Sequence, residues 1–378
     1  MRIYLSPPHQ TGTELQFLQE ALDSNFLAPT GPMLDRFEDE IRERSGRAHA
    51  LALNTGTAAI HLAIRHLIDH RHPREDPRPP LVLASSLTFV ASVAPAVQLG
   101  CEVRLIDAEF ESWTLDPVLL SHALQEARSE SRQVLCVIPT DLYGQRCDLK
   151  AIIGLCEPAG IPVLSDAAEA MGAKDLVSLS PRPWAEVYSL NGNKIITASA
   201  GGVLVTDDEL LAGHARKLSM QAREDFPHYE HRELGYNYRM SNLLAAVGLA
   251  QLQKLEERVA QRRIVFEGYR QRLAHVPGIR LMPEAAWNRC TRWLTVILVD
   301  EDEFGASPRE IRKALAAEGI ESRPMWKPLH AQPALAHLRF YDHGVSNTLF
   351  QCGLCLPSGS ALTESNLDEI CEIILKTK

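Results

Sequence analysis

The sequence lacks the features that mark membrane, secreted and repeat proteins. Its 378 residues contain no apolar run that approaches the roughly 20 residues of a membrane span. The N-terminal stretch Met-Arg-Ile-Tyr-Leu-Ser-Pro-Pro-His has no signal-peptide core, so we expect a cytoplasmic location. We find neither an internal repeat nor a low-complexity tail. What remains is an ordinary globular chain with room for one large or two medium domains.

Clustered cysteine and excess positive charge are also missing. The eight cysteines are scattered, and several lie inside apolar runs, where reduced cysteine behaves as a small hydrophobe. Cys352-Gly-Leu-Cys355 is the only C-x-x-C motif, so we expect neither zinc nor a redox role. The formal net charge of −9 disfavours nucleic acid or an anionic membrane as a partner, although local positive charge can still hold an anionic small ligand.

Strand-like and helix-like segments alternate between about residues 45 and 206. This alternation predicts an α/β fold with a largely parallel sheet covered on both faces, and ligands bind such sheets at the carboxyl ends of the strands. The expected helices include Gly56–Ile68, Pro117–Ala127 and Leu149–Ala159. The expected strands are Ala50–Leu53, Leu81–Ala84, Glu102–Ile106, Val134–Ile138, Pro162–Ser165, Ala185–Ser189 and Gly202–Val205.

A second, smaller unit is expected toward the C-terminus. One long helix is predicted from about Ser241 to Ala274 because its apolar positions keep helical spacing. The following pieces suit a small α+β domain: a strand at Trp293–Val299, a helix at Pro308–Glu318 and a closing helix from Thr363. We therefore divide the chain into a large domain with an N-terminal arm, residues 1–250, and a small domain, residues 251–378.

Lys194 and Asp166 are the most informative pair of residues. Lys194 lies in a loop rich in Gly and Asn between two strand-like segments, and Asp166 ends an apolar run 28 residues upstream. Alone, each has an ordinary interpretation, as a solvated lysine and as a helix N-cap. Together they are the groups that hold pyridoxal phosphate (PLP): the lysine forms an imine with its aldehyde, and the carboxylate keeps its ring nitrogen protonated.

Other residues at the same sheet edge suit a phosphate and a flat ring. The stretch Asn54-Thr-Gly-Thr follows a strand and opens a helix, whose free N–H groups attract anions. For that motif alone, an ordinary strand-to-helix turn with a Thr cap is the favoured interpretation. Ser189 ends a strand and offers a hydroxyl for a phosphate, and Phe89 is placed to stack on a ring unless it belongs to the core.

Cations and histidines mark three further segments. Arg323-Pro-Met-Trp-Lys-Pro-Leu-His330 combines two cations with a Trp, which suits a diphosphate and a base or sugar, although an exposed loop is the simpler interpretation. His66 and His70 share a helix face, but without a nearby carboxylate ligand a solvated face is favoured over a metal site. His228 and His231 likewise have no further ligands in sequence, so we expect no metal.

An ordered set of motifs resembles the DegT/DnrJ/EryC1/StrS family of nucleotide-sugar aminotransferases over nearly the whole chain. Each motif is weak alone, but the ordered set is specific. Its members are Ser6-Pro-Pro, Ser24-Asn-Phe-Leu-Ala-Pro, Gly56-Thr-Ala-Ala-Ile-His, Asp166-Ala-Ala-Glu, Asn191-Gly-Asn-Lys-Ile-Ile-Thr, Gly235-Tyr-Asn-Tyr-Arg-Met-Ser and Leu356-Pro-Ser-Gly. Within the family, Leu83-Ala-Ser-Ser, Ala91-Ser-Val-Ala-Pro and the Arg323–His330 cluster most resemble the UDP-4-amino-sugar aminotransferases of bacillosamine biosynthesis.

The resemblance implies a type I PLP-dependent aminotransferase fold, with a mostly parallel seven-stranded sheet, and a homodimer with sites at the subunit interface. It implies Lys194 as the Schiff-base lysine and Asp166 as the partner of the ring nitrogen. The remaining implied cofactor contacts are Gly56, Thr57 and Ser189 at the phosphate, Asn237 from the other subunit, Phe89 stacked on the ring and Glu169 near it. The implied substrate contacts are Asn25, Phe26, Leu27, Ala28, Arg323, Trp326, Lys327 and His330.

The reaction that the resemblance implies is amino transfer from L-glutamate to C4 of a UDP-linked 4-keto-6-deoxy-N-acetylhexosamine. GDP-perosamine-type chemistry is the alternative substrate class. A PLP-dependent sugar dehydratase is disfavoured because Lys194 is retained and no cysteine cluster for an iron–sulfur centre exists. A non-catalytic protein on the same scaffold has no need of Lys194, Asp166 and Ser189 together.

The sequence departs from the family pattern between Gly172 and Tyr188. Family members usually carry a Gly-containing hairpin there, whereas this chain has Ala173-Lys-Asp-Leu-Val-Ser-Leu-Ser-Pro-Arg-Pro-Trp. Ala198 and Ala200 also stand where Thr and Gly are usual. The first departure puts the local hairpin in doubt, but it leaves the chemistry of Asp166, Ser189 and Lys194 in place.

Overall fold

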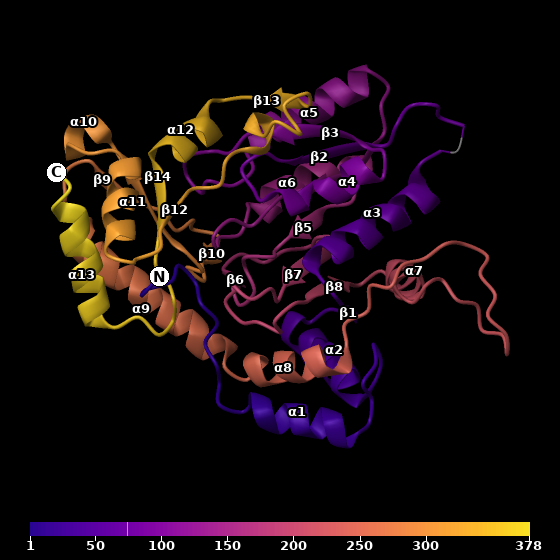
Figure 1. Ribbon diagram of the computed structural model, residues 1–378. Helices are drawn as coiled ribbons and strands as arrows, with labels where there is room; N and C mark the ends of the chain where they lie inside the picture. The colour runs from indigo at the N-terminus through magenta and orange to yellow at the C-terminus, as the bar shows by residue number, and fades with distance from the viewer. Residues whose placement is uncertain (74) are drawn as a thin grey trace.

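A computed structural model describes residues 1–73 and 75–378, and its centre is a large, mostly parallel sheet (Figure 1). Its two halves have the strand orders β1-β8-β7-β5 and β13-β3-β2-β4, and the isolated parallel bridges Val137–Val163 and Thr140–Asp166 join β5 to β4. Only β8 runs antiparallel to its neighbours. The strands are β1 (His49–Leu53), β2 (Leu81–Ser85), β3 (Glu102–Ile106), β4 (Val134–Ile138), β5 (Leu164–Asp166), β7 (Ala185–Ser189), β8 (Gly202–Thr206) and β13 (Arg339–Tyr341).

Successive side chains of each strand point to opposite faces of this sheet, so each face packs against its own set of helices. Leu81 and Leu83 of β2 pack with α5 and α6, whereas Val82 and Ala84 pack with α3 and α4 on the other face. Every residue of β2 is buried as a result. The helices of these layers are α3 (Gly56–Arg71), α4 (Ala94–Gln98), α5 (Pro117–Ser129), α6 (Leu149–Cys156) and α7 (Glu209–Ser219), with 3₁₀ turns at Val90–Ser92 and Glu157–Ala159.

These elements confirm the predicted α/β fold and the predicted strands, of which Glu102–Ile106, Val134–Ile138 and Ala185–Ser189 match residue for residue. The strand β13 was not anticipated. It comes from the C-terminal part of the chain and pairs in parallel with β3 at the sheet edge. The division of the chain at residue 250 stays a prediction, and β13 is a segment that crosses it.

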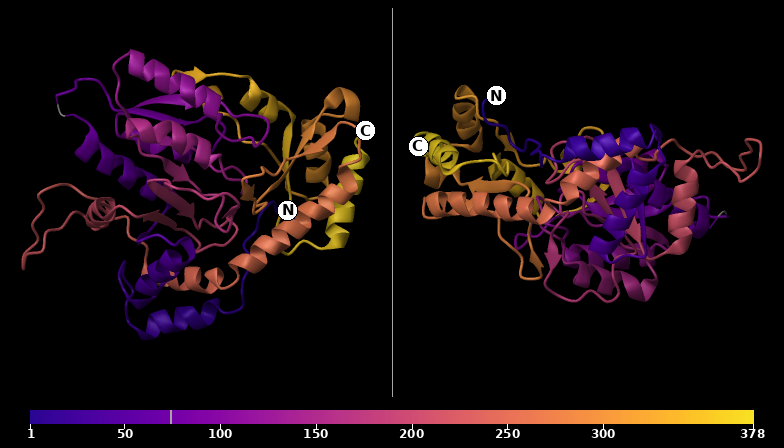
Figure 2. Two further views of the ribbon diagram at one scale, coloured as in Figure 1. Left: turned by 180° about the vertical axis from the view of Figure 1, so that it is seen from behind. Right: turned by 90° about the horizontal axis from the view of Figure 1, so that it is seen from below.

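A smaller antiparallel sheet lies beside the large one (Figure 2). Its order is β12-β14-β11-β9, and it shares a core with α9, α11 and α13. Ser307 and Glu310 form a capping box at the start of α11, and Thr363 caps α13. The elements are β9 (Ile279–Leu281), β11 (Thr295–Val299), α10 (Glu301–Phe304), α11 (Pro308–Ala317), β12 (Arg323–Pro324), a 3₁₀ turn (Leu329–Ala331), α12 (Val345–Cys352), β14 (Gly353–Leu356) and α13 (Glu364–Leu375).

The prediction of one long helix over Ser241–Ala274 is wrong, because two helices occupy that stretch. They are α8 (Asn242–Leu252) and α9 (Leu255–Leu273), separated at Gln253 and Lys254. The helix α8 packs against α1 (Glu14–Asp23) and α2 (Pro32–Ser45), whereas α9 shares the core of the small sheet. The chain must change direction between these two surfaces, as Figure 1 shows, so tertiary packing overrides the helical periodicity.

The doubtful hairpin region pairs with a distant strand instead of with itself. β6 (Lys174–Asp175) lies antiparallel to β10 (Asn288–Arg289), and the backbone N–H of Leu176 donates to the carbonyl of Trp287 at 2.8 Å. The segment that stands in place of the family hairpin therefore connects the large-sheet part of the chain to the stretch between β9 and β11 of the small sheet.

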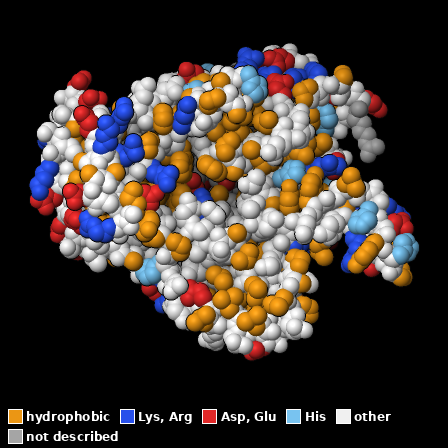
Figure 3. Space-filling model, viewed as in Figure 1, with side chains coloured by type: hydrophobic (Ala, Val, Ile, Leu, Met, Phe, Trp, Pro, Cys, Tyr) orange, Lys and Arg blue, Asp and Glu red, His pale blue; other side chains and the backbone are white. Residues whose placement is uncertain are grey.

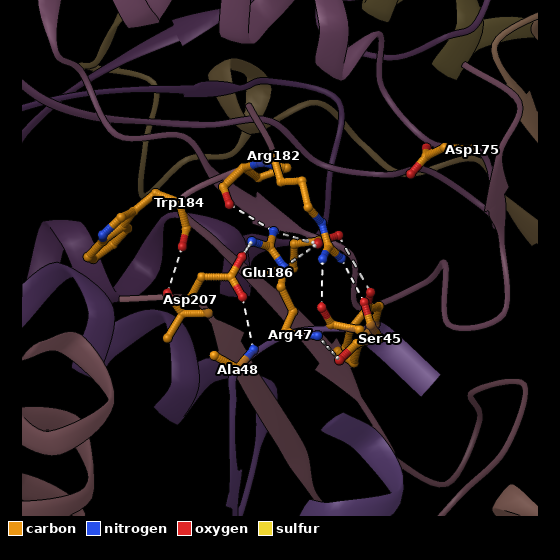
Figure 4. A network of polar contacts seen from close by, with 12 residues as sticks. Ser45, Arg47, Ala48, Asp175, Arg182, Trp184, Glu186 and Asp207 are labelled. Atoms are coloured by element: carbon orange, nitrogen blue, oxygen red, sulfur yellow. Dashed lines mark hydrogen bonds and ion pairs between the residues drawn. The ribbon is translucent and has the colours of Figure 1, made fainter. Parts of the chain in front are cut away.

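A buried network of charges ties α2 to the sheet below it (Figure 4). The Arg47 guanidinium lies 2.8 Å from the Glu186 carboxylate and 2.6 Å from Asp207, while Arg146 pairs with the other Glu186 oxygen and with Asp175. Burial acts to raise the pKa of Glu186, but Arg146 and Arg47 hold that pKa below its usual value. The carboxylate therefore stays charged and joins two arginines inside the protein.

None of the helices in the described part of the chain combines the length and the hydropathy that a bilayer crossing requires.

Glu186→Gln tests the buried network. Since the substitution removes the buried carboxylate that joins two buried guanidinium groups, we expect the free energy of unfolding to fall by about 3–5 kcal/mol, measured by urea denaturation. The matched control is Glu372→Gln in the exposed pair with Lys376, for which we expect less than about 1 kcal/mol. Because the folded pKa of Glu186 lies below the unfolded value of 4.5, the wild-type advantage is full above pH 4.5 and fades as the pH falls. Equal losses in the two variants contradict the assignment.

Candidate functional site

A cavity of about 270 Å³ opens at the carboxyl ends of the parallel strands. It brings together residues that are far apart in the sequence, from the start of α3, the end of β5, the loop between β7 and β8 and the loop after β12. The predicted residues on its wall are Gly56, Thr57, Phe89, Asp166, Glu169, Ser189, Lys194 and Trp326. Sequence reasoning thus identified one continuous surface.

Lys194 lies in the loop between β7 and β8 with its side chain directed at an acid and an aromatic ring. Its Nζ lies 3.6 Å from Oε1 of Glu169 and 4.3 Å from the centre of the Trp293 ring. Only 13% of the side chain is exposed. Cation–π attraction and the carboxylate together hold the amine in a partly dry site, where it faces the cavity.

The backbone beside Lys194 is clamped by side chains of other elements. The carbonyl oxygen of Asn193 accepts hydrogen bonds from Trp293 Nε1 at 2.8 Å and from Ser6 Oγ at 2.6 Å. Arg262 of α9 in turn donates to Ser6 Oγ at 3.0 Å. The N-terminal segment and the small-sheet side of the molecule therefore fix the position of the lysine loop.

Asp166 ends β5 and is buried against hydroxyl donors. Its Oδ2 accepts from Ser92 Oγ at 2.5 Å, and its Oδ1 accepts from the backbone N–H of Ala168 at 3.1 Å. Thr88 Oγ1 lies 2.7 Å from Ser92 Oγ and continues the chain of hydroxyl groups. Burial raises the pKa of Asp166, while the Ser92 hydrogen bond and the Lys194 charge oppose that rise. A cationic group in the cavity would further favour the charged form.

Glu169 is the second buried acid on the wall. Its Oε2 accepts from the backbone N–H of Tyr143 at 2.8 Å, and its Oε1 accepts from Trp326 Nε1 at 3.3 Å. Tyr143 also accepts from the backbone N–H of Trp326 at 2.8 Å through its hydroxyl oxygen. Burial raises the pKa of Glu169, and the Lys194 ammonium opposes the rise. Glu169 thus links the lysine to the loop that carries Trp326.

The start of α3 forms a backbone cradle at one end of the cavity. The Thr55 hydroxyl caps the helix by accepting from the N–H of Ala58. The N–H groups of the first helical residues, Gly56 and Thr57, have no partner within the helix and point along its positive end. Ser189 adds a hydroxyl from the end of β7, on the same wall. These groups suit a phosphate.

Gly202 of β8 lets the strand pass close to this cradle. A Cβ atom at Gly202 would lie 2.2 Å from the nitrogen of Gly56 and 2.5 Å from the carbonyl oxygen of Thr55. No side chain fits at that separation. The geometry of the helix start therefore depends on the missing side chain at position 202.

A second cavity of about 550 Å³ continues outward from the first. The two share Phe89, Asn193, Trp293 and Trp326 on their walls. Arg323 lies on the outer cavity with an exposed side chain, 2.9 Å from Glu321, and Phe89 is 56% exposed at the mouth. The outer cavity therefore combines a cation with aromatic rings.

Several predicted contact residues lie elsewhere. In the part of the chain that the structure describes, Asn25–Ala28, Asn237, Lys327 and His330 are not on the walls of these two cavities. Asn25–Ala28 follow α1, and Asn237 is exposed in the segment before α8. Both His330 nitrogens are engaged, with Ser86 Oγ at 2.7 Å and Asn347 Oδ1 at 3.0 Å, which favours a structural role for that ring.

Sequence reasoning gave no role to Ser92, Trp293 and Tyr143, which contact Asp166, Lys194 and Glu169. Ser92 lies in the Ala91-Ser-Val-Ala-Pro motif that supported the resemblance. Ser92 follows Phe89 within about one helical turn. A hydroxyl side chain so close to a candidate ring-stacking residue is a sign, visible in the sequence, that it belongs to the same site. Trp293 and Tyr143 reach the site only through the packing of the two sheets.

Comparisons with known proteins agree with this geometry. Residues 8–375 match the model of the DegT/DnrJ/EryC1/StrS aminotransferase family. EpsN of Bacillus subtilis (strain 168), which is assigned as a pyridoxal phosphate-dependent aminotransferase, is 44% identical over 99% of this chain and 95% of its own. A GDP-perosamine synthase of Caulobacter vibrioides is 33% identical over 98% of this chain and 96% of its own.

Solved structures share the fold at lower identity. Helicobacter pylori PseC, an aminotransferase involved in the biosynthesis of pseudoaminic acid, superposes with a TM-score of 0.88 at 21% identity, covering 99% of this chain and 98% of its own. A DegT DnrJ EryC1 StrS aminotransferase from Brucella abortus gives a TM-score of 0.85 at 24% identity, covering 96% and 94%. These likenesses support the fold.

Gly202→Ala tests the backbone cradle. The new Cβ collides with the start of α3, so we expect a loss of about 1–3 kcal/mol in the free energy of unfolding together with weaker binding of PLP. Gly154→Ala, in an exposed position of α6 with open space around it, is the matched control and should gain about 0.5–1 kcal/mol. Urea denaturation and titration with PLP give both quantities. Retained PLP affinity in Gly202→Ala would refute the cradle.

Proposed function

The chain belongs to the DegT/DnrJ/EryC1/StrS aminotransferase family and is a PLP-dependent aminotransferase, and we propose a specific reaction for it. The proposed reaction transfers the amino group of L-glutamate to C4 of a UDP-linked 4-keto-6-deoxy-N-acetylhexosamine. The product is UDP-2-acetamido-4-amino-2,4,6-trideoxyglucose. The observation that carries the proposal is that Lys194 and Asp166 meet in one cavity that opens toward Arg323 and Trp326.

The residues present fit PLP. The start of α3 and the Ser189 hydroxyl provide donors for its phosphate, and the buried carboxylate of Asp166 provides a partner for its ring nitrogen. Phe89 borders the cavity with an exposed ring that suits stacking. Lys194 places a primary amine opposite these groups. When bound, PLP supplies an aldehyde that reacts with primary amines and a ring that accepts electrons.

Lys194 is the proton carrier in the proposed mechanism. Its Nζ is held on one side by Glu169 and on the other by the Trp293 ring, so the amine would stay in the cavity when it is not bonded to the cofactor. From there it moves a proton from the Cα atom of glutamate, and in the second half-reaction it returns a proton to C4 of the sugar. Catalysis by a fixed amine of this kind requires a dry, preorganised wall, which the two Trp rings provide.

Asp166 holds a proton at the ring nitrogen. Burial alone disfavours its charge, but the hydrogen bonds from Ser92 and Ala168 favour the carboxylate, and a protonated ring nitrogen completes the pairing. Glu169 positions Trp326 and Lys194 relative to each other. We assign it a positioning role rather than a reacting one.

The outer cavity is the proposed place of the nucleotide sugar. The exposed Arg323 guanidinium suits a diphosphate, and the rings of Trp326 and Phe89, 6.1 Å apart, suit the face of a sugar or base. Lys327 follows on the same loop with an exposed side chain and offers a second cation. Although the chain as a whole is acidic, Arg323 and Lys327 thus supply positive charge near the mouth of the cavity.

A second copy of the chain is the proposed source of the remaining contacts. The segment between α7 and α8, which carries Asn237 at its base, projects from the body of the molecule (Figure 1). Apolar side chains gather over α1 at the bottom of Figure 3, where Leu15 and Leu22 are exposed. Phe26 and Leu27 extend this surface. A homodimer that buries it would bring Asn25–Ala28 and Asn237 toward the partner's cavity.

A GDP-linked 4-keto-6-deoxy sugar is the second candidate substrate. The GDP-perosamine synthases of Caulobacter vibrioides and Vibrio cholerae are 33% and 31% identical to this chain, each over most of its length. The UDP assignment rests on the motifs that link this chain to UDP-4-amino-sugar enzymes, including Arg323–His330. A dehydratase with an iron–sulfur centre is disfavoured, because the eight cysteines are free and seven of them are buried.

Lys194→Ala tests the cofactor lysine. We expect complete loss of turnover and, after borohydride reduction, loss of the PLP-modified peptide in mass spectrometry. Lys327→Ala on the exposed loop is the matched control, and it should keep the modified peptide while raising KM for the nucleotide sugar several-fold. Near-normal turnover of the Lys194→Ala enzyme would contradict the assignment of Lys194 as the cofactor lysine.

The substrate is tested by product NMR with L-glutamate and, separately, UDP- and GDP-linked 4-keto-6-deoxy sugars. We expect an equatorial 4-amine on the UDP-linked N-acetyl sugar. Turnover of the GDP sugar alone moves the substrate to the perosamine type and leaves the roles of Lys194 and Asp166 unchanged. Absence of amination with both sugars, together with no spectral change on adding glutamate, contradicts the proposed reaction.

A further inference from the structure

Three histidines gather at a point outside the catalytic cavity. His66 and His70 lie one turn apart on α3, and His214 lies on α7, which packs against α3. One ring nitrogen of each histidine lies within 4.8 Å of the others. From sequence alone, a solvated face is the favoured interpretation of His66 and His70, because no carboxylate ligand is evident nearby. The structure supplies His214, which is 148 residues away from His66 in sequence.

The hydrogen bonds of two of these rings fix which nitrogen is free to ligate. His70 Nδ1 lies 2.9 Å from the carbonyl oxygen of His66, so that nitrogen carries the proton and Nε2 keeps its lone pair. His214 Nε2 lies 3.3 Å from a carboxylate oxygen of Glu233, so Nδ1 keeps its lone pair. A backbone carbonyl and a carboxylate are the usual partners that orient metal-binding imidazoles.

The spacing of the ring nitrogens suits a small cation. His66 Nδ1 and His214 Nδ1 face each other at 3.2 Å, a distance that accommodates one proton between two nitrogens. Two imidazoles on a tetrahedral Zn²⁺, each at about 2.0–2.1 Å, have nitrogens about 3.4 Å apart. His70 is exposed and stacks on His66 at 4.3 Å, and one of its ring nitrogens lies within 4.8 Å of the ligand nitrogens of the other two rings.

We infer that His66, His70 and His214 bind one divalent cation of the zinc class. Neutral imidazole suits Zn²⁺, Ni²⁺ and Cu²⁺ better than the hard cations, which prefer oxygen. Asp69 and Glu233 stand beside His214, with one carboxylate oxygen of each within 4.8 Å of a His214 nitrogen, and they supply negative charge next to the cation. Lys217, 2.9 Å from the other Glu233 oxygen, holds that carboxylate in place.

The cation has a structural role in this assignment. His66 is ten residues beyond Gly56 on α3, which at 1.5 Å per residue puts it about 15 Å along the helix from the phosphate cradle. A cation there joins α3 to α7 and, through Glu233, to the projecting segment that leads to Asn237. It therefore stabilises the layer that carries one end of the catalytic cavity, and it takes no part in amino transfer.

The test uses the PLP-loaded full chain without a polyhistidine tag, stripped with a chelator and titrated with Zn²⁺ in a calorimeter. We expect one Zn²⁺ per chain, a weakening of at least ~10-fold in His70→Ala and in His214→Ala, and a ~10–100-fold weakening in Glu233→Gln. His275→Ala, an exposed histidine in the turn after α9, is the matched control and should bind as the wild type does. Zn²⁺ should raise the Tm of the wild type and of His275→Ala alone.

Co²⁺ substitution gives a second measurement that does not depend on folding energy. Three imidazoles and one further ligand produce the intense visible bands of four-coordinate Co²⁺, and His214→Ala should lose them. Circular dichroism and retained PLP verify that the variants fold. Wild-type Zn²⁺ affinity in both His70→Ala and His214→Ala, or the weak spectrum of six-coordinate Co²⁺, overturns the inference and leaves the three rings as an aromatic packing cluster.

Discussion

The buried charges that border the large sheet are held by opposite charges and by hydrogen bonds, and the arrangement of the sheet depends on that constraint. Beneath α2, Glu186 joins Arg47 to Arg146, and the carboxylates of Asp207 and Asp175 add further negative charge beside these two guanidinium groups. At the opposite edge, Asp166 and Glu169 face Lys194 with donors from Ser92, Ala168 and Tyr143. The first group is complete within the chain. In the second group one lysine faces two carboxylates, so hydrogen-bond donors supply the rest of the stabilisation.

The catalytic wall is built jointly by the two sheets. Strand ends of the large sheet supply Asp166 and the lysine loop, whereas Trp293, beside β11 of the small sheet, and Ser6, from the N-terminal segment, hold the backbone next to Lys194. Trp326 reaches Glu169 from the loop after β12. The position of the Lys194 amine therefore depends on both sheets. A shift of the small sheet relative to the large one would move that amine within the cavity.

The extent to which sequence predicts this protein follows the range of the interactions involved. The apolar run Val134–Ile138 defines β4 to the residue, because a strand buried on both faces tolerates little else, and β3 and β7 keep apolar residues at most positions around Arg104 and Glu186. The break between α8 and α9 has no Gly or Pro signal at Gln253 and Lys254, since it arises from the two surfaces that the helices cover. Lys194, Asp166 and Ser189 were predictable because their chemistry is rare at strand ends. Trp293 and His214 are brought to their partners by tertiary packing, so no local pattern marks them, whereas the motif around Ser92 is visible in the sequence.

The close passage of β8 over the start of α3 divides the cavity into an invariant floor and a variable mouth. Position 202 admits hydrogen alone, so the floor has essentially one solution for every descendant of this fold that keeps the helix cradle. Phe89 and Arg323, by contrast, are exposed, and each contacts a side chain at the cavity mouth rather than the packed core. Substitutions that alter the proposed sugar preference can therefore accumulate at the mouth without changing the reaction. A combinatorial library aimed at new acceptors should be confined to these mouth positions.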